Sequence, residues 1–289
     1  MVAYKSREHD WNMGCRQGFT LFEIAIVLTI IALIIGGIVL GKSVMTNSQI
    51  QSVVADVNNF KNAAKMFQEK YHYLPGDFPG AVNFWSADTT CPTGDTSNYL
   101  QRTKTCNGDG DGFIGGAEDG DTNYPSPTNV GTNYREALRL WQHLSNARFI
   151  NEAYSGIPYA GFYKAGINIP RAKTANSHGF AMFYSYALNS ASQTPDGVTH
   201  SGGYPGAYKH IIEFGNVTNT SDPQDGLDNP AITAAQAKSL DAKIDDGQPS
   251  TGNVRSFTSS SNSSTCSNSS AYLSTGSDIA CALIFVTGF

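Results

Sequence analysis

A short acidic segment near residue 110 has the side chains and the spacing to bind a metal ion. From Asn107 it reads NGDGDGFI, and Glu118 follows. Counted from Asn107, oxygen-bearing side chains fall at positions 1, 3, 5 and 12 and a glycine at position 6, which is the register of an EF-hand calcium loop. The expected ligands of a structural calcium ion are the side chains of Asn107, Asp109, Asp111 and Glu118 and the carbonyl of Phe113.

The sequence around this segment does not predict the two helices of a complete EF-hand. Cys106 stands where the entering helix would be, and further Gly and Asp residues follow the segment. We therefore expect an EF-hand-like loop rather than an EF-hand domain. The alternative is an acidic surface loop built from Asp-Gly turns.

A second candidate is the single charged residue of a long apolar run. The 23 residues from Phe19 to Gly41 contain no charge except Glu23, and as a helix they cover about 34 Å, enough to span a bilayer core. A carboxylate inside a bilayer costs about 2.5–3.5 kcal/mol on insertion scales, so it normally has a partner. We expect Glu23 to have a function; the alternative is a glutamate in an interfacial turn of an ordinary signal anchor.

No pattern in the chain is typical of an enzyme. The sequence contains no H-E-x-x-H, G-x-S-x-G or C-x-x-C motif, and we expect His143 and His210 to be packing residues. The segment Gly36–Ser43, GGIVLGKS, matches the phosphate-loop pattern, but it lies in the apolar run, where Lys42 is better explained as an anchor at the membrane surface. We therefore expect neither catalysis nor nucleotide binding. A net charge of −5 argues against a nucleic-acid binder, and a mean hydropathy of −0.27 excludes a polytopic membrane protein.

The apolar run is expected to continue as a helix. Between Lys42 and Tyr71 the apolar residues recur every three or four positions, which predicts one amphipathic stripe. The first proline of the chain, Pro75, ends the pattern. We expect a transmembrane helix over 19–41, an amphipathic helix over 42–71, and a long helical domain over 19–74.

The remainder, 75–289, is turn-rich and polar and is expected to form a globular α+β head. Helices are predicted over 134–149 and 233–244, the second with a capping box between Thr233 and Gln236. Strands are predicted over 180–188, 208–215 and 281–286. Residues 256–270, rich in Ser and Asn, are expected to be an exposed loop. The fold class is thus α+β, with a small antiparallel sheet and long loops.

The junction before the apolar run carries a recognisable motif. Residues Gly18 to Glu23 read GFTLFE, after a short charged leader and before the apolar and amphipathic helix. This combination resembles the processing site of type IV prepilins and type II secretion pseudopilins. The resemblance implies that a prepilin peptidase removes leader 1–18 by cutting after Gly18 and that Phe19 becomes an N-methylated first residue. It also implies that Glu23 pairs with the terminal amine of a neighbouring subunit.

A second resemblance extends into the head. The stretch YHYLPGDFPGA after the long helix, the NGDGDG loop, the tetrapeptide WQHL from Trp141 and the heptapeptide KIDDGQP from Lys243 are similar to those of a bacterial group of pilin-like proteins. Unlike many pilins, the apolar helix has no proline. Gly36-Gly37 either loosens the helix in its place or allows close helix packing, and the sequence leaves both open.

The family resemblance implies a structural, non-enzymatic subunit of a type IV pilus or a type II secretion pseudopilus. Its expected partners are prepilin peptidase, other pilin or pseudopilin subunits, the inner membrane, and an assembly platform with its ATPase. The alternative is a minor tip pilin whose head binds a surface, DNA or a secreted substrate. A membrane-anchored enzyme that borrows the leader is a third. The size of the head, about 215 residues, favours a minor pilin or a pseudopilin over a major pilin.

The cysteines indicate the compartment of the head. Cys15 leaves with the leader, which also changes the net charge from −5 to −6 because the leader has three positive and two negative residues. Four cysteines then remain, and sequence proximity favours two pairs among three pairings. Disulfides persist in an oxidising compartment, so a single-pass inner-membrane protein with a periplasmic head is expected, later in a pilus or pseudopilus and at the cell surface in some cases. The favoured pairs are Cys91–Cys106 and Cys266–Cys281.

Overall fold

The structure is a computed structural model of the whole chain. It describes residues 19–88, 104–115, 133–157, 163–184, 209–217, 227, 229–257, 266–268, 270–273 and 278–289. The chain divides into two compact units, Met1–Asn47 and Ser48–Phe289. Each unit is considered by itself.

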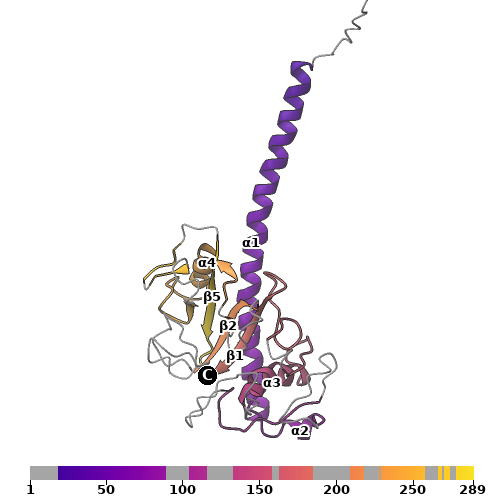
Figure 1. Cartoon of the computed structure of the whole chain (residues 1–289), viewed down its shortest axis with the longest axis vertical. Helices are drawn as coiled ribbons and strands as arrows, with labels where there is room; N and C mark the ends of the chain where they lie inside the picture. The colour runs from indigo at the N-terminus through magenta and orange to yellow at the C-terminus, as the bar shows by residue number, and fades with distance from the viewer. Residues whose placement is uncertain are drawn as a thin grey trace, which may run out of the picture. The chain divides into compact units, whose positions relative to one another are not determined.

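One helix, α1 (Leu21–Tyr71), forms the described part of the first unit and enters the second (Figure 1). The single helix predicted from the periodicity is confirmed. It ends at Tyr71, where His72 adopts a left-handed φ of 64°, and Pro75 prevents it from resuming. In the second unit its stripe is buried as predicted, through Ile50, Val53, Val57, Phe60, Ala64 and Phe67.

An antiparallel sheet forms the centre of the second unit. Strands β1 (His178–Tyr184), β2 (His210–Asn216), β5 (Ile279–Val286) and β3 (Ile232–Thr233) lie in the order β1-β2-β5-β3, and β4 (Val254–Phe257) also pairs with β5. The three predicted strands are confirmed to within a few residues, and 185–188 lie outside the described residues. The expectation that Ser256 begins an exposed loop is wrong, because β4 pairs Ser256 with Leu283 and buries it.

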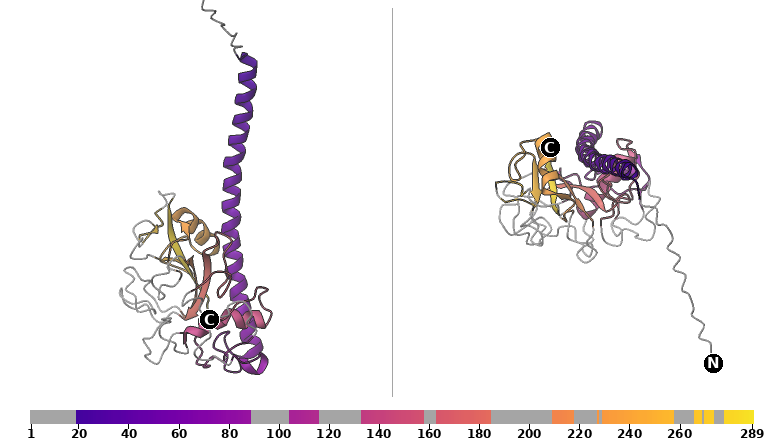
Figure 2. Two further views of the ribbon diagram at one scale, coloured as in Figure 1. Left: turned by 45° about the vertical axis from the view of Figure 1, so that its right-hand side comes forward. Right: turned by 90° about the horizontal axis from the view of Figure 1, so that it is seen from above.

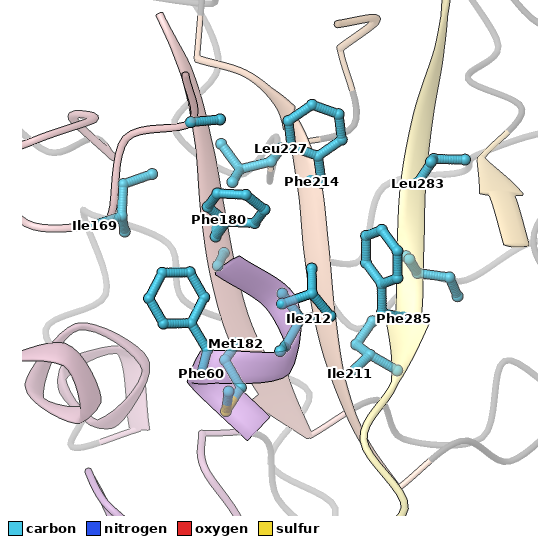
Figure 3. Close-up of a cluster of buried hydrophobic side chains, with 14 of the residues drawn as sticks. Phe60, Ile169, Phe180, Met182, Ile211, Ile212, Phe214, Leu227, Leu283 and Phe285 are labelled. Atoms are coloured by element: carbon cyan, nitrogen blue, oxygen red, sulfur yellow. The ribbon is translucent and has the colours of Figure 1, made fainter. Parts of the chain in front are cut away.

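Aromatic side chains join α1 to this sheet. Phe60 of α1 lies 5.3 Å from Phe180 of β1 and 4.9 Å from Trp141, measured between ring centroids in edge-to-face geometry. Figure 3 shows Phe60 beside Phe180, with Phe214 on the next strand. Such pairs add to the free energy gained by burying the rings, so the buried stripe of α1 is fixed against the sheet by ring contacts.

The described part of the second unit has three further helices: α2 (Ala81–Phe84), α3 (Asn133–Asn146) and α4 (Ala234–Ile244). The predicted capping box of α4 is confirmed, since Thr233 accepts from the Gln236 amide and Gln236 accepts from the Thr233 amide. α4 lies beside β5 (Figure 2). α3 contacts β1 and is buried on every side from Glu136 to Leu144.

A disulfide joins Cys266 to Cys281 on β5, so this favoured pair is confirmed. Cys106 is also disulfide-bonded, and Cys91 lies outside the described residues. The Cys266–Cys281 bond spans 15 residues of sequence. A loop of that length restricts the unfolded chain and stabilises the fold by about 3 kcal/mol in the chain-entropy model.

Replacing both Cys266 and Cys281 by serine is therefore expected to lower the free energy of unfolding by about 3 kcal/mol. Urea unfolding of the full chain in detergent, without reductant, measures this loss. Reduced and oxidised wild-type protein serve as references. A double variant that unfolds at the wild-type urea concentration would contradict the prediction.

Candidate functional site

The first candidate site is the start of α1, where Thr20 and Glu23 form a reciprocal cap. The Glu23 amide donates to Thr20 Oγ1 at 3.2 Å, and Glu23 Oε2 accepts from both the amide and the hydroxyl of Thr20 at 2.8 Å. This is a capping box, which satisfies amides that a helix start leaves unpaired. Glu23 Oε1 receives no hydrogen bond from any residue that the structure describes. One oxygen of the carboxylate thus holds the cap while the other faces outward.

The helix that follows this cap exposes its apolar side chains. Phe19 is 84% exposed, Leu21 89% and Phe22 73%, and apolar residues stay exposed through Leu40 and on to Met45. The stretch Leu21–Ile38 is long and apolar enough to cross a membrane, a property that an N-terminal signal sequence shares. A soluble monomer rarely exposes apolar surface of this extent, so the segment needs an apolar environment or other helices around it.

The glycines of this segment do not interrupt α1. Gly36, Gly37 and Gly41 are helical, and apart from neighbouring residues of the helix itself no described atom lies within 4 Å of the Cβ position of any of them. The helical backbone of Gly36–Ser43 commits its amides to the helix, whereas a phosphate loop must aim them at its ligand. The glycine faces remain open to close packing by another helix.

The second candidate site is a group of four carboxylates in the head. Asp77 and Glu136 are buried, at 1% and 4% exposure, whereas Asp109 and Asp111 are exposed. One oxygen of each carboxylate lies within 4.8 Å of one oxygen of every other. The group brings together the turn after α1, the acidic loop and the first part of α3.

The two buried carboxylates hold the acidic loop by its backbone. Asp77 Oδ1 and Oδ2 accept from the amides of Gly110 at 2.6 Å and Gly112 at 3.0 Å. Glu136 accepts from the amides of Asp109 and Gly115, both at 3.0 Å. These hydrogen bonds fix the loop in a tight path.

Two glycines allow this path. Gly110 and Gly112 have φ of 82° and 93°, a region that disfavours residues with a Cβ.

Burial perturbs both anchoring carboxylates. It raises the pKa of Asp77 to about 7 and that of Glu136 to about 8, against the lowering effect of the loop amides. The nearby charge of Asp109 raises both pKa values further. A cation that binds among clustered carboxylates favours their ionised form and so lowers their raised pKa values.

The four carboxylates suit a calcium ion. Calcium takes six to eight hard oxygen ligands at about 2.3–2.6 Å, so oxygens on opposite sides of the ion are about 5 Å apart, consistent with the 4.8 Å limit of this group. Of the ligands expected from the sequence, Asp109 and Asp111 are in the group. Asn107 instead accepts from the Val82 amide at 3.0 Å.

Two expected ligands remain, Phe113 and Glu118. The Phe113 amide donates to Asp111 Oδ1 at 2.8 Å, and its ring packs on Tyr184. Glu118 lies outside the described residues. Asp77 and Glu136 were not among the ligands expected from the sequence.

α3 holds the surrounding loops through buried polar side chains. Gln142 donates to the carbonyls of Lys104 and Ser155, both at 3.0 Å. His143 Nδ1 accepts from the Gly76 amide at 3.0 Å, and burial lowers the pKa of His143 to about 3. A neutral, hydrogen-bonded His143 confirms the expected packing role.

The second predicted histidine also packs. His210 is 3% exposed. Its Nε2 accepts from the Ile114 amide at 3.2 Å, and its Nδ1 lies 3.0 Å from the Phe289 carbonyl. Burial lowers the pKa of His210 to about 4. It joins the end of the acidic loop to the last residue of the chain.

A second acidic group combines Asp241 of α4 with Asp245 and Asp246 of the turn that follows this helix. Asp241 accepts from the Tyr272 hydroxyl at 2.8 Å and from the Gly247 amide at 3.2 Å. Asp245 and Asp246 also accept from neighbouring backbone amides. These hydrogen bonds account for the turn in the KIDDGQP segment.

Comparisons of the chain with protein-family models, with curated proteins and with solved structures found no match. The sites described above therefore have to be interpreted from their own geometry and chemistry.

Proposed function

We propose that the chain is a structural, non-enzymatic subunit of a type IV pilus or a type II secretion pseudopilus. It is cut after Gly18, N-methylated on Phe19 and polymerised through its N-terminal helix. The observation that carries this proposal is the capped carboxylate of Glu23 at the start of a fully exposed apolar helix. One of its oxygens is available to a partner, and its charge lies where a bilayer penalises an unpaired carboxylate.

Cleavage after Gly18 would create the partner. The new terminal amine of Phe19 is a cation at the start of a helix, where the helix dipole is positive and the cation is unfavourable. The Glu23 carboxylate of an adjacent subunit neutralises it, and the low dielectric around the helices strengthens the pairing. Prepilin peptidase, the inner membrane, other subunits and the assembly ATPase with its platform are the partners this proposal requires.

The head remains in the periplasm until assembly. Its disulfide and its polar, weakly charged composition suit an oxidising compartment. We also propose that Asp77, Asp109, Asp111 and Glu136 hold a structural calcium ion. Its contribution there is to offset the negative charge of the clustered carboxylates and so fix the acidic loop.

Processing is the direct test. When the chain is made together with a prepilin peptidase, mass spectrometry is expected to find a product of 271 residues that begins with N-methylated Phe19. Gly18→Leu is expected to leave the full-length chain, because a side chain then occupies the scissile position. Gly41→Leu, the same substitution at a glycine within α1, should be cleaved normally. A wild-type chain that keeps its leader beside an active peptidase would refute the proposal.

A further inference from the structure

A groove of about 690 Å³ opens on the surface of the second unit. One wall is α1, which contributes Asp56, Asn59 and Met66; the other consists of the segments 149–154 and 166–173. Its lining includes Phe60 and Tyr154, which are 8% and 6% exposed. The volume is in the range of about 300–1,000 Å³ that is typical of sites for small ligands.

The carboxylate of Asp56 is half-buried in this groove and has no hydrogen-bond donor among the described residues. Every other buried or half-buried carboxylate that the structure describes accepts at least one hydrogen bond, as Asp77, Glu136 and Asp241 do. Burying an ionised group without a donor is costly. Burial is the main reason why the pKa of Asp56 is raised. The groove thus holds a carboxylate that lacks a hydrogen-bond donor among the described residues and that a ligand could satisfy.

Two charges of opposite sign act on Asp56, and neither forms an ion pair with it among the described residues. Lys173 and Glu152 are the charges that act most strongly on it, and Arg171 lies further along the same wall. No ion pair or hydrogen bond within the described part of the chain uses the side chain of Glu152 or Lys173. The Arg171 Nη2 atom donates only a 3.3 Å bond to the Ala165 carbonyl. The acids and the bases are therefore both open to a ligand.

A ligand that satisfies these groups carries one positive and one negative charge. An ammonium group fits Asp56 and Glu152, and a carboxylate fits Lys173 and Arg171, since charge-assisted hydrogen bonds are the strong ones. Three exposed amide side chains also line the groove and match the alternating donors and acceptors of a peptide backbone. These are Asn59, Asn62 and Asn151.

We propose that this groove binds a short peptide through its free amino and carboxyl termini. The ammonium end lies at Asp56, the carboxylate end at Lys173 and Arg171, and an apolar side chain packs on Met66 and Phe60. The groove is formed by residues of the second unit only. The proposal is therefore independent of how the N-terminal helix functions.

Titration calorimetry tests this with the full chain in detergent micelles at low salt and the tripeptide Ala-Leu-Ala. Saturable binding is expected in the millimolar range or tighter. Asp56→Asn and Lys173→Met should each weaken it at least tenfold, and so should acetylation of the peptide's amine together with amidation of its carboxylate. Glu69→Gln, an exposed change on the same helix outside the groove, should leave the affinity unchanged.

Three results would overturn the proposal. One is that the wild-type chain does not bind the free peptide saturably in the millimolar range, although its melting temperature shows that it is folded. The second is equal binding of the capped and free peptides. The third is a normal affinity in Asp56→Asn. Loss of association between copies in Asp56→Asn, with no peptide binding in the wild type, assigns the groove to a contact between subunits instead.

Discussion

Replacing Glu23 by glutamine is expected to leave the chain in the membrane and to reduce fibre formation at least tenfold. Glutamine at this position still accepts from the Thr20 amide and hydroxyl, because Glu and Gln serve equally in a capping box. The helix start is therefore kept while the negative charge is lost. Only a role for the charge itself, such as pairing with a terminal amine, predicts a strong defect from this change.

Two measurements separate assembly from insertion. Sheared fibres are counted by electron microscopy and immunoblotting, and resistance to alkaline extraction reports membrane insertion. Thr20→Ala is the companion variant, because it removes the hydroxyl of the cap and keeps the charge. Glu69→Gln, which removes a negative charge from the exposed face of α1 in the head, should assemble normally. Wild-type fibre yields from Glu23→Gln would show that its charge has no part in polymerisation.

Millimolar calcium is expected to raise the melting temperature of the chain, and to raise it more at pH 8 than at pH 6. An ion at a hundredfold excess over its dissociation constant stabilises by about 2.7 kcal/mol. Each kcal/mol raises the melting temperature of a domain of this size by about 2–4 °C. Protons compete with calcium for the same oxygens, so acid weakens the effect.

The pH dependence without metal follows from the same carboxylates. The pKa values of Asp77 and Glu136 are raised to about 7 and 8, so the folded chain holds protons that the unfolded chain has released. Their contribution to stability is complete below the ordinary pKa and is lost as the pH rises through 7 and 8. His143 and His210, with pKa values lowered to about 3 and 4, act in the opposite direction, but only below about pH 6.5.

In a chelator, the free energy of unfolding is therefore expected to fall by about 2 kcal/mol between pH 6.5 and 8.5. Thermal unfolding followed by circular dichroism measures both effects on the full chain in detergent. The double variant Asp109→Asn, Asp111→Asn should lose the calcium response. Asp246→Asn, in the other acidic group, should keep it. If calcium leaves the melting temperature of the wild-type chain unchanged at pH 8, there is no calcium site here.

Periodicity was enough to predict the elements that pack by a single apolar pattern. The spacing from Ile50 to Phe67 predicted the buried stripe of α1, and Thr233 with Gln236 predicted the start of α4. β4 was missed because its four residues, VRSF, are too few and too polar for an alternating pattern. Its burial depends on pairing with β5, a contact distant in sequence.

The acidic group shows the same limit in a functional site. Asp109 and Asp111 belong to a local motif, and local spacing identified them. Asp77 and Glu136 come from 32 residues before and 27 residues after Asp109, and only the fold brings them to it. α3 is buried on every side from Glu136 to Leu144. Its buried polar side chains, such as Gln142 and His143, contact loops that are distant in sequence.

The way α3 holds these loops has a consequence for how the head can evolve. Gln142 contacts carbonyl oxygens and His143 receives an amide, while Glu136 receives the amides of two loop residues. Every residue type except proline offers the same main-chain groups. The loop sequences can therefore change wherever the path does not require a glycine, as it does at Gly110 and Gly112, and wherever the side chain is not one of the proposed calcium ligands. The buried side chains of this one helix cannot change as easily. The head thus combines a helix whose side chains are fixed by their contacts with loops that are held mainly through their backbone.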